Sequence, residues 1–154
     1  MSILVSAFLI GVIAGLRALT APTLVSWAAG FGWIHLEGTP FHFLALPITR
    51  YIFTAAAIAE IINDKLPSTP SRKAPPGFIT RIVTGGLSGA ALGASHESLV
   101  LGLLAGVVGA VVGTLGGAEF RSRLVKAIGG NDLPIALLED VIAIVGAYLI
   151  VSHT

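Results

Sequence analysis

The residues from Leu99 to Gly117 form an apolar run without a charged side chain, and this run limits the fold more than any other feature. A helix needs about 20 apolar residues to cross the roughly 30 Å hydrocarbon layer of a membrane. The chain of 154 residues is 55% hydrophobic and 11% charged, whereas soluble domains contain about 25% charged residues. Length and composition therefore predict a single all-α polytopic membrane domain over residues 1–154.

Four further apolar stretches bring the predicted transmembrane helices to about five, at residues 2–30, 44–62, 77–94, 99–117 and 133–151. The first would be about 42 Å long as a straight helix, which is more than a membrane requires. Gly15 and Pro22 bracket its middle and predict a kink or break there. We expect one kinked span. The alternative is a re-entrant hairpin, which would move the N-terminus to the other side.

Lysine and arginine are concentrated in two of the four predicted loops. Residues 31–43 and 95–98 contain neither, while residues 63–76 and 119–130 contain Lys65, Arg72, Lys73, Arg121, Arg123 and Lys126. Because basic loops face the cytoplasm, we expect a protein of the cytoplasmic (inner) membrane with its N-terminus inside and its C-terminus outside. The basic loops would contact anionic lipid headgroups, so membrane lipids are expected partners.

Glycines recur at four-residue intervals in the third and fourth predicted helices, at Gly85, Gly89, Gly93, Gly102, Gly106, Gly109, Gly113 and Gly117. Small residues at this spacing let two helix backbones approach closely. We expect these helices to pack on each other or across a dimer; a pore lining or a hinge is the alternative. Since about 150 residues form only a thin wall around a pathway, we also expect a homo-oligomer.

Ionisable side chains inside the apolar stretches are the candidate functional residues, because each costs about 2.5–3.5 kcal/mol at the centre of an inserted helix. Arg17 lies near the middle of its stretch and should pair with a carboxylate or with exposed carbonyls. Arg50 and Arg81 lie nearer to helix ends, so we expect both to reach toward the headgroups. The predicted substrate- or ion-binding residues are Arg17, Glu60, Asp64, Arg81, Glu139 and Asp140.

Glu139 and Asp140 are the strongest of these signals, because they lie about two turns into the last helix. Adjacent helical residues point about 100° apart. We therefore expect one carboxylate to face Arg17 or Arg81 and the other to face a cavity or a second subunit. Carboxylates removed from water bind protons more readily, which suits a proton- or cation-linked site. The same residues equally suit a static network of ion pairs.

Three motifs occur in order along the chain: Gly-Leu-Arg-Ala at 15–18, Glu-x-x-x-Asp-Lys-x-Pro at 60–67, and Glu-Asp-Val at 139–141. Together they resemble the bacterial membrane family catalogued as domain of unknown function 4126. The resemblance covers essentially the whole chain. It implies a small polytopic protein without an assigned activity, and it draws attention to the same charged residues.

Two helices open with the same tripeptide, Leu-Pro-Ile, at 46–48 and at 133–135. Since they would enter the membrane from opposite sides, the match indicates an inverted repeat, which is typical of transporters. A rival alignment pairs Asn63-Asp64 with Asn131-Asp132 over an equally short match.

The chain lacks the common signatures of hydrolases, zinc proteases and P-loop enzymes. His35, Glu37 and His42 lack a regular ligand spacing, and there is no cysteine, so we expect no metal site and no cofactor. A net charge of +1 gives no reason to expect nucleic acid. We therefore predict a transporter or channel-like protein for a small ion or molecule, and not an enzyme. The alternatives are a non-transporting scaffold or lipid-interacting protein and, third, an intramembrane lipid enzyme.

Overall fold

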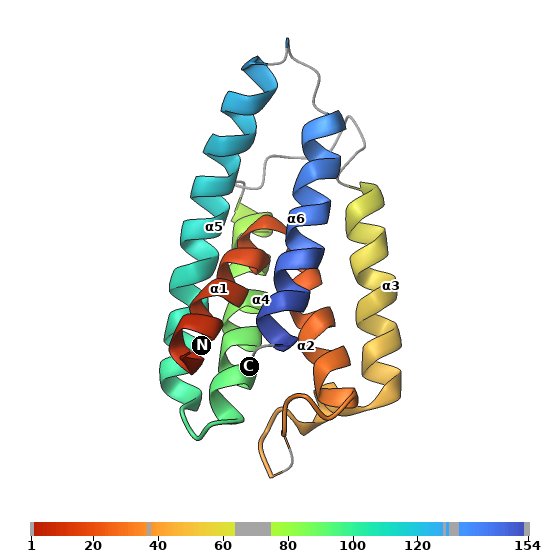
Figure 1. Cartoon of the computed structure of the whole chain (residues 1–154), viewed down its shortest axis with the longest axis vertical. Coiled ribbons are helices and arrows are strands. Elements are labelled where there is room, and N and C mark those ends of the chain that lie inside the picture. The colour runs from red at the N-terminus through yellow and green to blue at the C-terminus, as the bar shows by residue number, and fades with distance from the viewer. Residues whose placement is uncertain (1, 37, 64–74, 128, 130–132, 153–154) are drawn as a thin grey trace.

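The computed structural model describes residues 2–36, 38–63, 75–127, 129 and 133–152. Within these residues the regular structure is helical, with no strand, and this confirms the predicted all-α class. The elements are α1 (Ile3–Leu16), α2 (Thr20–Gly30), the 3-10 helix η1 (His42–Ala45), α3 (Pro47–Asn63), α4 (Pro75–Ala94), α5 (Leu99–Ala127) and α6 (Leu133–Ser152) (Figure 1).

The first apolar stretch folds as two helices, which confirms the predicted break. α1 ends at Leu16, Arg17 has an extended backbone with φ −140° and ψ 108°, and α2 begins at Thr20. Pro22 lies in the first turn of α2, where a helix does not need its missing N–H group. The break therefore lies between Gly15, in the last turn of α1, and Pro22, in the first turn of α2.

The two halves form a hairpin (Figure 1). Gly11 of α1 lies against Gly106 of α5, and Gly15 lies against Ala110. Since residue numbers rise in the same direction on both helices, α1 runs parallel to α5. α2 runs in the opposite direction beside α3: Leu19, which precedes its first residue, contacts Glu60, and Trp27 in its last turn contacts Tyr51. The expectation of one kinked span is therefore wrong, and the hairpin alternative describes the fold.

The start of α1 and the end of α6 lie in the same half of the bundle (Figure 1). The prediction of an inside N-terminus and an outside C-terminus placed the two ends on opposite faces. The hairpin adds one reversal of chain direction, and this reversal brings both ends to the same face.

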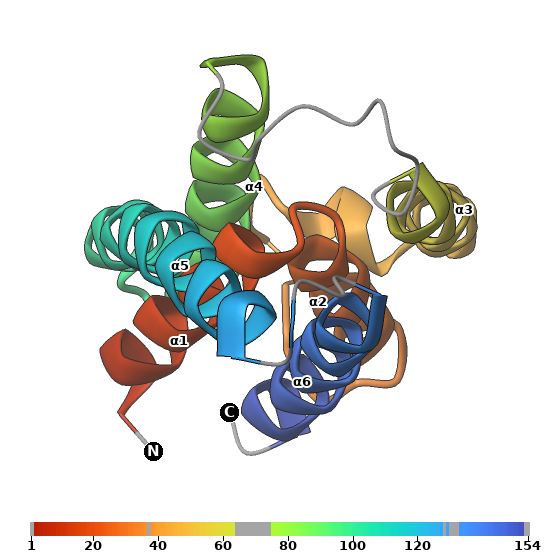
Figure 2. The ribbon, with the colours of Figure 1, turned by 90° about the horizontal axis from the view of Figure 1, so that it is seen from above.

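Glycines set the packing of α5 against its two main neighbours. A Cβ atom on Gly89 of α4 would lie 2.4 Å from the carbonyl oxygen of Gly102, and one on Gly113 would lie 2.3 Å from that of Val12 in α1. A methyl group at either position would force the helix backbones apart. The rest of the bundle is organised around α2, which packs against α3, η1 and α6, with α3 at the edge (Figure 2).

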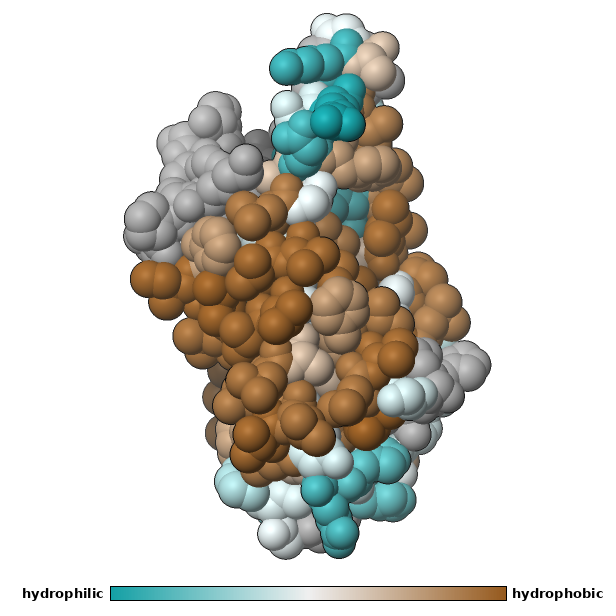
Figure 3. Space-filling model, turned by 90° about the vertical axis from the view of Figure 1, so that its left-hand side faces the viewer, coloured by the Kyte–Doolittle hydropathy of each residue, from teal (hydrophilic) through white to brown (hydrophobic). Residues whose placement is uncertain are grey.

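One segment of the described residues, Leu99–Leu124, is long and apolar enough to cross a membrane, and Ile3–Leu16 and Phe78–Ala94 are apolar but shorter. The structure thus identifies one clear candidate span and leaves the predicted count of about five unconfirmed. A broad apolar band covers the middle of the surface in Figure 3, with polar side chains gathered at both ends. Large exposed apolar side chains occur on several helices, among them Ile52, Ile58, Leu104, Val108, Val112, Val141, Val145 and Leu149.

Candidate functional site

The break between α1 and α2 leaves peptide groups at two helix ends without helical partners. The N–H groups of Ala18 and Leu19 each donate to a different carboxylate oxygen of Glu60 on α3, both at 2.9 Å. The carbonyl oxygen of Gly15 accepts a hydrogen bond from Nε of Arg81 on α4 at 3.1 Å. Each helix end thus meets the charge that its dipole favours, a carboxylate at the N-terminus and a guanidinium at the C-terminus.

Arg17 lies within the break, and its side chain is 0% exposed. Its Nε and Nη2 atoms both lie 2.5 Å from Oδ1 of Asp140 on α6. Hydrogen bonds between ionised partners are shorter and stronger than neutral ones. This pair therefore ties the last helix of the chain to the tip of the first hairpin.

These contacts form a balanced set of two guanidinium and two carboxylate groups, which we call the break cluster: Arg17, Glu60, Arg81 and Asp140. Its members come from the break, α3, α4 and α6. Opposite charges and helix ends satisfy one another here, which is how charged groups are usually tolerated in an apolar interior.

Arg81 differs from its prediction. We expected its side chain to reach toward lipid headgroups, but it is 6% exposed and donates to the end of α1. The expectation fails because the hairpin brings an acceptor carbonyl, that of Gly15, to the side of α4. A buried acceptor within reach removes the need to extend toward water.

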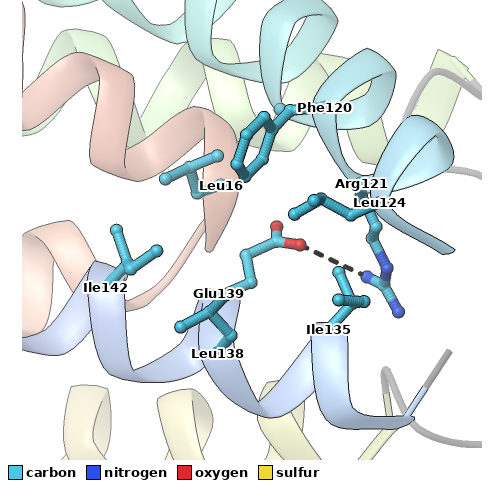
Figure 4. Close-up of a pocket in the computed structure, with 9 residues that line it drawn as sticks. Leu16, Phe120, Arg121, Leu124, Ile135, Leu138, Glu139 and Ile142 are labelled. Atoms are coloured by element: carbon cyan, nitrogen blue, oxygen red, sulfur yellow. Dashed lines mark ion pairs between the residues drawn. The ribbon is translucent and has the colours of Figure 1, made fainter. Parts of the chain in front are cut away.

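Glu139 lies next to Asp140 in the sequence but faces a separate cavity of about 110 Å³ between α5, α6 and the end of α1 (Figure 4). Its Oε2 atom lies 3.6 Å from Nη1 of Arg121 on α5, a separation typical of an ion pair rather than a hydrogen bond. The other lining residues are Leu16, Gly117, Phe120, Leu124, Ile135, Leu138 and Ile142. This cavity places one carboxylate and one guanidinium beside an otherwise apolar space.

The interpretation of the acidic pair is confirmed, since Asp140 faces Arg17 and Glu139 faces a cavity. Sequence reasoning missed Arg121, which it assigned to a loop. The structure continues α5 to Ala127, so Gly113, Gly117 and Arg121 follow one another at four-residue spacing on one helix face. The four-residue spacing of these three residues is the sequence signal that could have placed Arg121 on the helix instead of in a loop.

Asp64 and Glu37 lie outside the described residues, and so do Lys65, Arg72 and Lys73 of the predicted basic loop and Asn131-Asp132 of the rival repeat alignment. Among the residues that the structure does describe, no group of three His, Asp or Glu side chains could hold a metal ion. Arg50 lies over Trp27, with its guanidinium carbon 5.1 Å from the ring centroid.

No curated protein and no solved structure matches the chain. One family model, described as Domain of unknown function (DUF4126), matches residues 4–154, a range that includes the break cluster and the cavity. This match confirms the resemblance carried by the three motifs, and the chain belongs to the DUF4126 family.

Proposed function

We propose that the chain is a multi-pass protein of the cytoplasmic membrane, with α3, α4, α5 and α6 crossing the bilayer and the α1–α2 hairpin entering and returning. The four helices have 17, 20, 29 and 20 residues. At 1.5 Å per residue each is about 25 Å or longer, close to the roughly 30 Å of a hydrocarbon layer. The exposed apolar side chains of α3, α5 and α6 support the same placement.

The proposed orientation follows from the basic residues at the end of α5, which are Arg121, Arg123 and Lys126. Basic segments face the cytoplasm, so this end is placed inside. Both chain ends then lie outside, because the start of α1 and the end of α6 share the opposite half of the bundle.

We further propose that this membrane protein is a transporter or channel for a small cation or for protons. The observation that carries the proposal is the Glu139–Arg121 pair on the wall of a cavity beside the tip of a broken helix hairpin. Transporters often place their binding sites at broken helices. Ionisable residues inside a membrane usually mark an ion path or a proton relay.

In this proposal the two charged regions have different roles. The break cluster holds the hairpin tip, because its four charges are matched with one another and with helix ends. Glu139 binds the cation or proton, and Arg121 is the counter-charge that an incoming cation displaces. A volume of about 110 Å³ suits a small ion with a few water molecules.

The second candidate is a non-transporting membrane scaffold. It is favoured by the balance of the break cluster, which could hold the helices in register without moving any ligand. The predicted homo-oligomer belongs to either candidate and stays a prediction.

The test is a flux assay with the purified protein in liposomes, using separate proton, sodium and potassium gradients. We expect Glu139→Gln to abolish the flux, because the amide cannot carry the charge that binds the cation or exchange a proton. The matched control is Glu119→Gln, since Glu119 pairs with Arg123 at the exposed end of α5. Absence of flux in the unmodified protein, or full flux in Glu139→Gln, would refute the transport proposal.

A further inference from the structure

Five aromatic rings form a continuous chain at the end of the bundle opposite the basic end of α5. In order they are Tyr51, Trp27, Phe31, Trp33 and Tyr148, with successive ring centroids 6.0, 5.6, 5.5 and 5.9 Å apart. All except Trp27 are exposed. Tryptophan and tyrosine gather where a membrane meets water, at the depth of the lipid headgroups. We call this part of the surface the aromatic end.

Arg50 is held in a fixed position at the aromatic end. Its guanidinium lies over the Trp27 ring, and the Trp27 Nε1–H donates to Oγ1 of Thr54 at 2.8 Å. The Thr54 hydroxyl donates in turn to the carbonyl oxygen of Arg50 at 2.7 Å. A Cβ on Gly30 would lie 2.4 Å from Nη1 of Arg50, so the guanidinium also packs on the glycine backbone.

Arg50 has no acidic partner within the described part of the chain. No described carboxylate lies within ion-pair distance of its guanidinium, whereas Arg17 and Arg121 each pair with one. Its Nε atom is buried and has no hydrogen bond to a described residue. The first turn of α3 also lacks an acidic residue, so the positive end of the helix dipole adds to the charge of Arg50. This position therefore attracts an anion that the described residues do not supply.

We propose that Arg50 binds the phosphate of an anionic phospholipid at the aromatic end. The planar guanidinium group matches the oxygens of a phosphate, and Arg50 is partly exposed. Exposed Ile48 and Ile52 on α3 offer an apolar surface for the acyl chains. The inference rests on the membrane placement proposed above but not on ion flux through the Glu139 cavity.

The test is native mass spectrometry of the full chain in detergent with phosphatidylglycerol, phosphatidylcholine or inorganic phosphate. We expect the unmodified protein to retain phosphatidylglycerol in preference to the other two. Arg50→Gln should lower that retention about fivefold, because one arginine contributes about 1 kcal/mol to binding an anionic surface. Arg123→Gln is the comparison variant, since it removes a cation from the basic segment at the other end. It should lower phosphatidylglycerol retention by less than Arg50→Gln does, because Arg123 is already paired with Glu119.

Gly30→Ala provides a second variant that keeps the charge of Arg50. Its new methyl group should displace the guanidinium from the Trp27 face and so lower phosphatidylglycerol retention, by less than Arg50→Gln does. Unchanged retention in both variants would overturn the proposal. Equal retention of inorganic phosphate and phosphatidylglycerol would also overturn it, since that result indicates a site for a soluble anion.

Alkaline carbonate extraction of cell membranes tests the proposed membrane placement separately from the proposed lipid site at Arg50. Release of the unmodified protein into the soluble fraction would refute both proposals. If the protein resists extraction and both variants still retain phosphatidylglycerol, only the lipid site is refuted.

Discussion

The break cluster and the cavity use neighbouring residues of α6 and yet differ physically. Asp140 meets a fully buried Arg17 at 2.5 Å, with the charges in direct contact. Glu139 lies 3.6 Å from Arg121, whose side chain is 18% exposed, and a cavity of about 110 Å³ adjoins the pair. The first pair is closed, while the second has room for a third group.

The comparison shows that the depth of a charged residue in an apolar segment does not reveal whether its side chain is enclosed or borders a cavity. A rotation of about 100° between consecutive helical residues turns one carboxylate toward the hairpin tip and the other toward a space. The property that distinguishes the two carboxylates is whether a cavity adjoins the side chain. Three variants test whether this property separates them in their effect on stability.

Asp140→Asn should have the largest effect, because it leaves the buried guanidinium of Arg17 without its counter-charge. We expect a loss of about 3–5 kcal/mol in the free energy of unfolding, measured by denaturant titration in detergent. Its control is the double variant Arg17→Met with Asp140→Leu, which removes both charges and should recover most of the loss. A single variant as stable as the unmodified protein would show that the break cluster is not structural.

Glu60→Gln should have an intermediate effect. The amide keeps one acceptor oxygen but turns its NH₂ group toward a backbone N–H group, of Ala18 or Leu19, that now loses its acceptor. We expect a loss of about 1–3 kcal/mol in the same unfolding measurement. Glu119→Gln, at an exposed pair with Arg123, should change the unfolding free energy by about 0.5 kcal/mol or less. Equal losses in the two variants would contradict a specific role for Glu60 at the helix end.

Of these three variants, Glu139→Gln should have the smallest effect on stability, about 1 kcal/mol. The pair with Arg121 is loose at 3.6 Å, and Arg121, whose side chain is 18% exposed, keeps some access to solvent after the charge is removed. The unfolding titration of this variant should therefore nearly overlay that of the unmodified protein. A loss as large as that of Asp140→Asn would remove the distinction between the two regions and favour the scaffold candidate.

The sequence was sufficient for features with local causes. Gly15 and Pro22 predicted the break, because glycine and proline end and start helices. The depth of Arg17 predicted a partner, and the adjacency of Glu139 and Asp140 predicted that they face different surroundings. Each of these predictions needed only helix geometry and the cost of burying a charge.

Helix geometry and the cost of burying a charge could not predict the features that depend on tertiary packing. A break does not encode the direction of the next helix, so the kinked span was preferred and the hairpin, which brings the chain ends to one face, was only the alternative. Arg81 was misjudged because its acceptor, Gly15, lies 66 residues away in the sequence. Arg121 was missed because Gly117 suggested a helix end, whereas the pair of Glu119 and Arg123 four residues apart supports continuation.

The pairing of Arg17 with Asp140 also limits the order in which the molecule can assemble. The two residues are 123 positions apart, so the ribosome completes the arginine long before its counter-charge. The neighbours of α1 on α5 likewise emerge late in synthesis. Until α6 has been synthesised, the hairpin therefore lacks the contact with Asp140 that holds its tip in the folded protein.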